Sequence, residues 1–232
     1  MRKLSAVLCI LALFAFVSGA MAQFGNKVAD TPHNLRKATT NGMSVEDYGE
    51  ICVYCHTPHS ANTSIDAPLW NRESPTGLYS MYSSPTIDMT MANSAQGVSL
   101  ACLSCHDGSI ALDQIINIPS AYSGQGASGT TIQTCATQCH IGNNPSGGIN
   151  FEGTFIGTDL SNDHPISITY DPTKDPKFKA ATNGMVDVLP LYGASKDQVE
   201  CATCHNPHDN STRPFLRKSN QNSQLCLTCH DI

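Results

Sequence analysis

The chain has 232 residues and a net charge of −6, because 19 aspartate and glutamate residues outnumber 13 lysine and arginine residues. This acidic balance disfavours nucleic acid and anionic membrane surfaces as partners, since both carry negative charge themselves. The chain also has 11 cysteines, which is many for its length, and their spacing is the most informative feature of the sequence.

The first 22 residues read as a signal peptide. Two basic residues precede an apolar run from Leu4 to Val17, and small residues follow up to Ala22. We therefore expect a signal peptide over residues 1–22 and an exported mature chain. The run of 14 residues is short for a membrane span, so we expect no membrane insertion, with an uncleaved anchor as the alternative.

A short cysteine motif occurs four times in the mature chain. Two cysteines are separated by two residues and followed at once by histidine, at Cys52, Cys55 and His56; Cys102, Cys105 and His106; Cys201, Cys204 and His205; and Cys226, Cys229 and His230. This pattern is typical of c-type haem attachment, in which the thiols bond to the porphyrin vinyl groups and the imidazole is the proximal iron ligand. One copy could be half of a zinc site or a redox dithiol. Four copies in one exported chain predict covalent haem.

The segments that carry the motifs predict short helices, at residues 44–56, 92–118, 195–205 and 219–230. In the first, Ser44 is a candidate N-cap and Asp47 occupies the capping-box position. In the second, Gly97 and Gly108 are expected breaks. Loops rich in Ser, Thr, Asn, Gly and Pro fill the rest. The expected fold class is therefore mostly irregular and loop-rich, with short α-helices bearing the motifs and little or no β-sheet.

A fifth, longer variant of the motif lies at Cys135, Cys139 and His140. Three residues separate its cysteines, so the bridging segment must bulge for both thiols to reach the vinyl groups. We predict a fifth haem here, with a Cys135–Cys139 disulfide as the alternative. Five haems would use all ten cysteines that remain after Cys9 leaves with the signal peptide, and without the variant motif the number is four.

The mature chain is poor in the residues that form an ordinary core. Leucine, isoleucine, valine and phenylalanine make up 38 of its 210 residues. So low a content would ordinarily indicate disorder. Porphyrins resolve the conflict, because large apolar cofactors would supply most of the core. We expect no compact fold without haem.

Four of the nine histidines lie outside the motifs and are candidate distal ligands, namely His33, His59, His164 and His208. His208 follows the proximal His205 by three residues and cannot reach the opposite face of the same haem. We expect it to bind a neighbouring haem, and His59, three residues after His56, to do the same; a surface histidine in a Pro turn is the alternative. His164 precedes a proline, which favours an extended backbone that projects the ring sideways.

Five haems with two histidines each would need ten histidines, one more than the chain has. The missing ligand could be a methionine, an open position for a small molecule, or a histidine from an adjacent subunit. If the variant motif holds no haem, the four candidates match the four remaining haems. A methionine is more typically an apolar contact, and the candidates are Met43, Met81, Met89, Met91 and Met185.

An internal repeat divides the mature chain. Each half begins with a histidine and the sequence Thr-Asn-Gly-Met, and then has a motif with a further histidine three residues after the motif histidine. A Pro-to-Arg segment follows (Pro68 to Arg72 or Pro214 to Arg217), and then a motif without such a further histidine. We therefore expect two paired-haem modules joined by a connecting region with the variant motif, over residues 23–118, 159–232 and 119–158, respectively.

The chain resembles the doubled-CxxCH multihaem cytochromes in three places, which are Cys52 to His59 with Cys102 to His106, Cys201 to His208 with Cys226 to His230, and the Asn162-Asp-His164-Pro-Ile segment. The resemblance implies bis-histidine haems stacked in a chain. It also implies export from bacteria that respire metals or other terminal acceptors. Some relatives shuttle electrons in the periplasm, and others polymerise into extracellular filaments.

These observations predict an electron-transfer protein and not an enzyme, because six-coordinate iron leaves no position for a substrate. The expected location is the periplasm or the cell surface. The expected partners are other redox proteins or extracellular electron acceptors, and self-assembly into a filament is a further hypothesis. The alternative function is a small haem reductase with one open, five-coordinate iron that acts on a small molecule such as nitrite.

Overall fold

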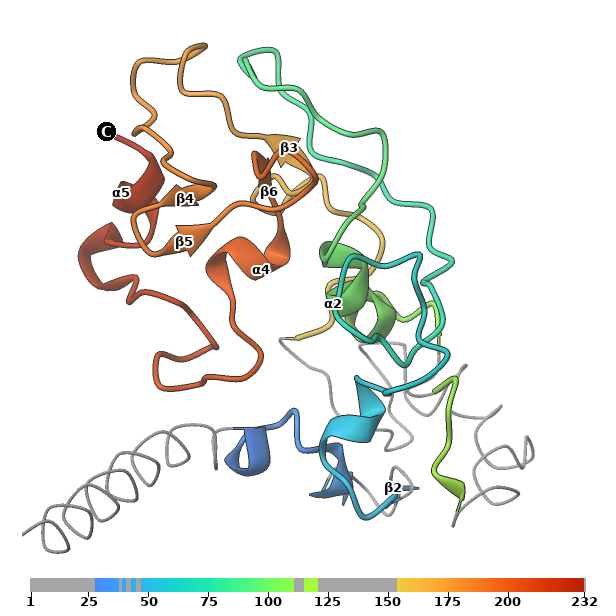
Figure 1. The fold of residues 1–232 in the computed structure, drawn as a ribbon. Coiled ribbons are helices and arrows are strands. Elements are labelled where there is room, and N and C mark those ends of the chain that lie inside the picture. The colour runs from blue at the N-terminus through green and yellow to red at the C-terminus, as the bar shows by residue number, and fades with distance from the viewer. Residues whose placement is uncertain are drawn as a thin grey trace, which may run out of the picture.

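The computed structural model describes residues 28–37, 39–40, 43–44, 47–110, 115–120 and 154–231 (Figure 1). Irregular chain predominates in these residues. The helices are α2 (Ser99–His106), α4 (Cys201–Cys204) and α5 (Cys226–Cys229), and the 3-10 turns are η1 (Val28–Asp30), η2 (Leu35–Lys37), η3 (Cys52–Tyr54) and η5 (Gln221–Ser223). The prediction of a loop-rich fold with short helices at the motifs is confirmed. The predicted signal peptide and the variant motif at Cys135, Cys139 and His140 lie outside the described residues.

The strands in the described part of the chain are two residues long and form three antiparallel pairs. They are β1 (Thr39–Thr40) with β2 (Met43–Ser44), β3 (Ile168–Thr169) with β6 (Gln198–Val199), and β4 (Met185–Val186) with β5 (Leu189–Pro190). In the second pair Ile168 lies opposite Val199. This pairing matters for the motifs, because it fixes the backbone directly before the third one.

The first predicted helix, over residues 44–56, is wrong in its extent. Ser44 lies in β2, and of the described residues in this region only Cys52–Tyr54 form a helical turn. The reason lies in Asp47, whose Oδ1 accepts a hydrogen bond from the N–H of Gly49 at 2.9 Å and a second from Arg36. Asp47 therefore closes a local turn instead of a capping box, and Gly49 follows with φ +75°, which ends any helix.

The other predicted helices are also shorter than expected. In the region 92–118 the described residues form one helix, α2, and the predicted breaks, Gly97 and Gly108, have φ +57° and +77° on either side of it. The region 195–205 is helical only in α4, because β6 holds the preceding residues in an extended ladder. The region 219–230 is interrupted by Asn222 at φ +53°. Local hydrogen bonds and turns thus confine the helices almost to the motifs themselves.

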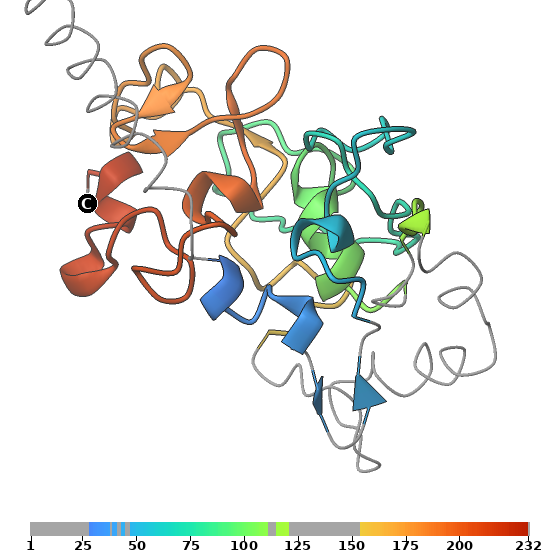
Figure 2. The ribbon, with the colours of Figure 1, turned by 60° about the horizontal axis from the view of Figure 1, so that its bottom comes forward.

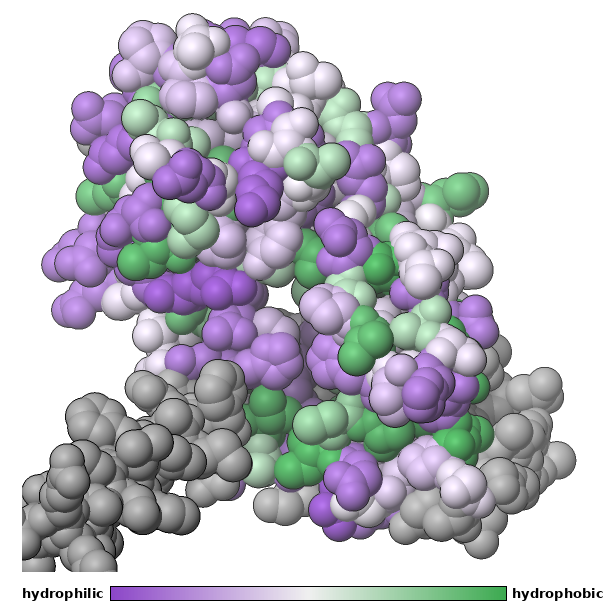
Figure 3. Space-filling model, in the orientation of Figure 1, coloured by the Kyte–Doolittle hydropathy of each residue, from purple (hydrophilic) through white to green (hydrophobic). Residues whose placement is uncertain are grey.

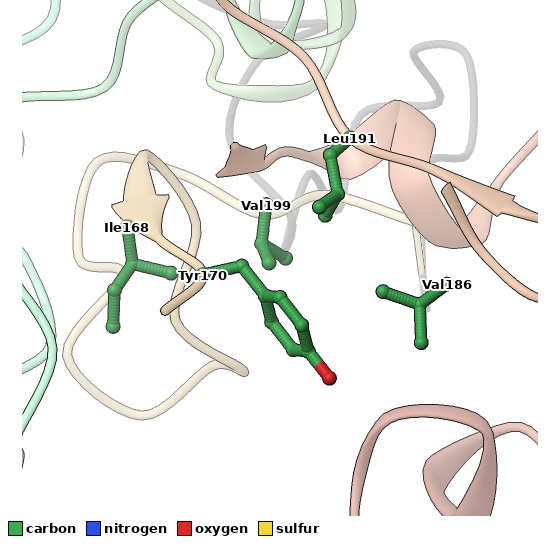
Figure 4. Close-up of a cluster of buried hydrophobic side chains, with 5 residues drawn as sticks. All are labelled: Ile168, Tyr170, Val186, Leu191 and Val199. Atoms are coloured by element: carbon green, nitrogen blue, oxygen red, sulfur yellow. The ribbon is translucent and has the colours of Figure 1, made fainter. Parts of the chain in front are cut away.

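Four small clusters of buried apolar side chains form the interior of the described part. One of them, which gathers side chains from around β3, β4, β5 and β6, consists of Ile168, Tyr170, Val186, Leu191 and Val199 (Figure 4). Met89 and Met91 pack against this cluster from the first half of the chain, and Met81 packs against another. These three methionines make the apolar contacts that are typical of the residue.

The two halves of the chain pack against each other. Met91 bridges to Ile168, and Ser80 bridges to Asp159. Helix α2 contacts α4, and both ribbon views place them side by side (Figures 1 and 2). Because α2 carries the second motif and α4 the third, this junction brings a motif of each half together.

Candidate haem-binding site

Each described motif places its two thiols one helical turn apart. The pairs lie in or next to η3 (Cys52, Cys55), α2 (Cys102, Cys105), α4 (Cys201, Cys204) and α5 (Cys226, Cys229). Residues three apart in a helical turn lie on the same side of it. Two thiols on one side suit the two vinyl groups of one porphyrin edge. All eight are free cysteines, so the short spacing does not serve disulfides.

Two other uses of paired cysteines fit the described residues poorly. In this part of the chain no three His, Cys, Asp or Glu side chains group closely enough to hold a metal ion, whereas a structural zinc site uses four ligands. Burial raises the pKa of Cys55 to about 12 and that of Cys204 to about 11, whereas the hydrogen bond with Cys102 lowers the pKa of Cys201. A redox dithiol reacts through a thiolate, which the surroundings of Cys55 and Cys204 disfavour.

Three of the motif histidines have their ring orientation set by a backbone carbonyl. The Nδ1 atoms of His56, His106 and His205 lie 2.7, 2.8 and 2.9 Å from the carbonyl oxygens of Pro68, Thr154 and Pro214, respectively. A carbonyl oxygen only accepts, so Nδ1 must carry the proton. The lone pair is then on Nε2, which is the tautomer that a metal-binding imidazole needs.

Two of the candidate distal histidines have the same orientation. Nδ1 of His33 lies 3.3 Å from the carbonyl of Pro207, and Nδ1 of His164 lies 3.0 Å from that of Pro165. Burial also lowers the pKa of His33. A neutral ring with Nε2 unprotonated is thus favoured at His33, and the carbonyl contact of His164 places a proton on its Nδ1 in the same way.

The Pro-to-Arg segments of the internal repeat explain the carbonyl contacts. After the first motif, the N–H of Asn71 donates to the carbonyl of Cys55 at 2.9 Å, and the carbonyl of Pro68 accepts from His56. After the third motif, the N–H of Arg217 donates to Cys204 at 2.8 Å, and Pro214 accepts from the histidine that follows. The sequence predicts the repeat but not this role, although its signal was a proline shortly after each of these motifs, 12 residues after His56 and 9 after His205.

The structure brings six histidines together as three pairs from distant parts of the chain. The ring centres are 6.0 Å apart for His56 and His208, and 6.4 Å apart both for His33 and His106 and for His164 and His230. Each pair joins one motif histidine to one candidate distal histidine. His208 lies opposite the histidine of the first motif, and not opposite that of its own motif.

These distances fit one iron between two imidazoles. Metal–imidazole bonds are about 2.0 Å long, and the ring nitrogen lies about 1 Å from the ring centre, so two ligands on opposite sides of one ion have centres about 6 Å apart. Direct packing of two rings gives centres about 4.5–7 Å apart, a range that includes these values. The three separations therefore leave the space that one iron between each pair would need, and the residues present fit haem.

Two further described histidines are not paired with another. Among the described residues, His59 and His205 have no histidine ring contact, and His59 takes part through its backbone carbonyl, which accepts from Thr57 Oγ1 at 3.0 Å and Asn117 Nδ2 at 3.0 Å. His205 has the Nδ1 contact already described. The ring contacts of the described residues therefore assign no distal candidate to the third motif.

Thiols of successive motifs are neighbours. Cys55 and Cys105 pack against the same apolar cluster. The thiol of Cys102 is hydrogen-bonded to that of Cys201, and this bond, with burial, raises the pKa of Cys102. The thiol of Cys229 is close enough to raise the pKa of Cys204. The motifs thus adjoin one another in their order along the chain.

The surface also leaves room near these thiols. Figure 3 shows an opening between the part of the surface over α4 and the part over α2, and hydrophobic side chains that gather around η3. Apolar side chains at the surface beside a motif suit a large apolar cofactor.

No helix in the described ranges is long and apolar enough to cross a membrane.

One family model matches the chain. Residues 194–232, which contain the third and fourth motifs, match the model described as doubled CXXCH motif. No curated protein matches. CXXCH motifs indicate covalent binding of haem c, and the paired imidazoles fit the iron that such a haem holds. Residues 194–232 thus carry the doubled CXXCH motif, and this match supports a multihaem c-type cytochrome.

Proposed function

We propose that this cytochrome carries electrons through haems whose iron is held between two histidines. The observation that carries the proposal is the set of three histidine pairs with ring centres 6.0 to 6.4 Å apart. We assign His208 to the haem of the first motif, His33 to that of the second, and His164 to that of the fourth.

The third motif takes His59 in this proposal. His208, three residues after the third proximal histidine, lies opposite His56 of the first motif. The internal repeat places His59 three residues after His56 in the same way. A reciprocal arrangement, in which each motif supplies the distal ligand of the other, then uses all eight described histidines.

A bound haem supplies an iron that gains and loses one electron. The three histidine pairs would hold this iron and would leave no position on it for a substrate, which supports electron transfer over catalysis. The backbone carbonyls at Nδ1 fix the rings and raise the basicity of Nε2. The contacts of Cys55 with Cys105, of Cys102 with Cys201, and of Cys204 with Cys229 support an electron path that follows the motifs in chain order.

The proposal extends to location and partners. The signal-peptide pattern supports export to the periplasm or cell surface, and the acidic charge supports redox proteins or extracellular acceptors as partners rather than nucleic acid. If the variant motif also holds haem, nine histidines leave one axial position to be completed from outside. A second copy of the chain would complete it in a filament, and a small molecule such as nitrite would complete it in a reductase.

An electron paramagnetic resonance spectrum of the oxidised protein tests the proposal, recorded on monomer and on any assembled fraction. Low-spin signals alone are expected for a carrier whose irons are saturated within one chain. High spin in the monomer that disappears on assembly would instead indicate a ligand donated between copies. High spin in both, shifted by nitrite or cyanide, would overturn the carrier in favour of the reductase. Intact mass gives the number of haems in the same sample.

A further inference from the structure

The junction of α2 and α4 contains a buried carboxylate that is not one of the proposed iron ligands. Glu200 is the N-cap of α4 and is 2% exposed. The hydroxyl of Ser99 on α2 donates to its Oε2, and the hydroxyl of Ser167, beside β3, donates to the same atom at 3.1 Å. Buried carboxylates are rare unless they are paired. The partners here are these two hydroxyl groups and the backbone N–H groups of Thr203 and Ser167, all of them neutral.

This carboxylate lies next to the attachment points of two haems. Glu200 directly precedes Cys201, whose backbone N–H donates to Ser99 Oγ at 2.9 Å. The same Ser99 hydroxyl therefore contacts both residues. The thiol of Cys201 is hydrogen-bonded to that of Cys102, the first cysteine of the second motif. A charge on Glu200 is thus close to both porphyrins that these cysteines would hold.

The charged and titratable groups around Glu200 do not stabilise its negative charge. Burial raises its pKa, the bonds from Ser99 and Ser167 lower it, and the carboxylate of Asp66 raises it. The other titratable groups nearby are the Cys201 and Cys102 thiols, which thioether formation removes, and Asp197 on the adjacent loop. A proton on Glu200 relieves both the burial and the repulsion by Asp66.

A solvent route reaches the carboxylate. Glu200 lines a surface cavity of about 370 Å³ between the loops at residues 96–97 and 193–198. Gly97, at φ +57°, passes so close that a Cβ there would lie 3.3 Å from Oε1 of Glu200. The backbone of Gly97 thus covers the carboxylate while the cavity beside it remains open to protons.

We propose that Glu200 is a proton-binding site that couples proton uptake to electron transfer at the junction of the two halves. This inference rests on the proposed electron-carrier function. When a one-electron donor reduces the ferric iron of the haem attached at Cys201 or Cys102, the Glu200 carboxylate takes one proton from solvent and becomes a neutral carboxyl group. One electron and one proton enter together, so the net charge at the junction does not change. Reoxidation releases both.

Spectroelectrochemical titration of the haem-loaded protein between pH 5 and pH 9 tests this coupling. An added electron favours the protonated carboxyl, so a reduction potential should fall as pH rises. One proton per electron corresponds to about 59 mV for each tenfold change in proton concentration. Glu200→Gln has the same shape without a titrating group. In this variant the reduction potential should no longer change with pH. Asp197→Asn, which changes another acid of the same cavity, should keep the slope.

A pH-independent potential in the wild type, or an unchanged slope in Glu200→Gln, would overturn the proposal. If Glu200→Gln does not fold with haem attached, the redox-induced infrared difference spectrum of the wild type tests the proposal instead. Reduction should then produce a carboxyl C=O band that shifts in D₂O, and its absence would contradict proton uptake by a carboxylate. These outcomes are distinct from failure of the electron-carrier function, which would appear as high-spin iron in the resonance spectrum while haem remains attached.

Discussion

At the residue scale, the environment of each histidine determines which nitrogen can bind iron. A carbonyl oxygen at Nδ1 forces the proton onto that atom, as at His56 beside Pro68 and at His205 beside Pro214. The distal partner is then chosen by the fold, since His56 lies 6.0 Å from His208 between ring centres. Ligand identity is therefore a property of two segments that the fold brings together.

Replacement of His208 should change one iron without loss of haem. In His208→Ala the haem at Cys52 and Cys55 loses its second imidazole, so a high-spin signal should appear while the intact mass still shows the full haem complement. In His208→Met the iron should stay low-spin, and its potential should rise because a methionine ligand favours the reduced state. Electron paramagnetic resonance and redox titration measure both effects.

The neighbouring variant Asp209→Asn is the control. In the wild type, Asp209 Oδ1 accepts a hydrogen bond from the backbone N–H of Ser211 at 2.9 Å, and the side-chain oxygen of an asparagine can accept the same bond. Its spectrum should equal that of the wild type. If the spectrum of His208→Ala also equals that of the wild type, His208 is a surface histidine and not an iron ligand.

At the element scale, the helices are little longer than the motifs that they carry. Helix α2 is the exception, with eight residues from Ser99 to His106. It buries Leu103 completely in a cluster with Ala95 and Leu160. Its stability therefore comes from packing between the halves, since a helix of this length is unstable alone.

Removal of the Leu103 side chain should destabilise the haem-loaded protein strongly. Leu103→Ala leaves a cavity in a fully buried site, and such changes lower the free energy of unfolding by about 2–5 kcal/mol. Leu78 is 93% exposed, so the matched change Leu78→Ala should leave it unchanged within about 0.5 kcal/mol. Urea unfolding, followed by the haem absorbance, compares the two. Equal midpoints would show that the α2 packing does not support the fold.

At the scale of the whole molecule, apolar side chains are too few and too dispersed for an ordinary core. The aliphatic residues and phenylalanine are fewer than one in five of the mature chain, and the described clusters contain three to five buried residues each. Conformational entropy opposes folding by about 1–2 kcal/mol per residue for the backbone alone. Covalent haem is the source of apolar surface that offsets it.

The chain produced without haem attachment should therefore lack a cooperative fold. Its circular dichroism should show no cooperative thermal transition, and limited proteolysis should degrade it much faster than the haem-loaded protein. The haem-loaded form, treated with the same protease, is the control. A sharp unfolding transition of the haem-free chain would mean that the polypeptide forms its core unaided.

The sequence by itself determined the features that depend on covalent spacing. The cysteine pairs and their adjacent histidines, the loop-rich class and the breaks at Gly97 and Gly108 are local, because each needs only a few consecutive residues. Helix lengths were overestimated for the opposite reason. The extended pairing of β6 and the turn at Asp47 compete with helix formation through contacts that the periodicity of one segment does not contain.

Only the tertiary structure decided which residues meet. The pairing of His56 with His208, the carbonyl of Thr154 at His106, and the position of Glu200 between α2 and α4 all join segments far apart in the chain. Contacts of this kind depend on how the loops cross, and loops carry little periodic signal. The chemistry of each motif is thus encoded locally, whereas the distal histidine that we propose for it and its charge environment arise from packing.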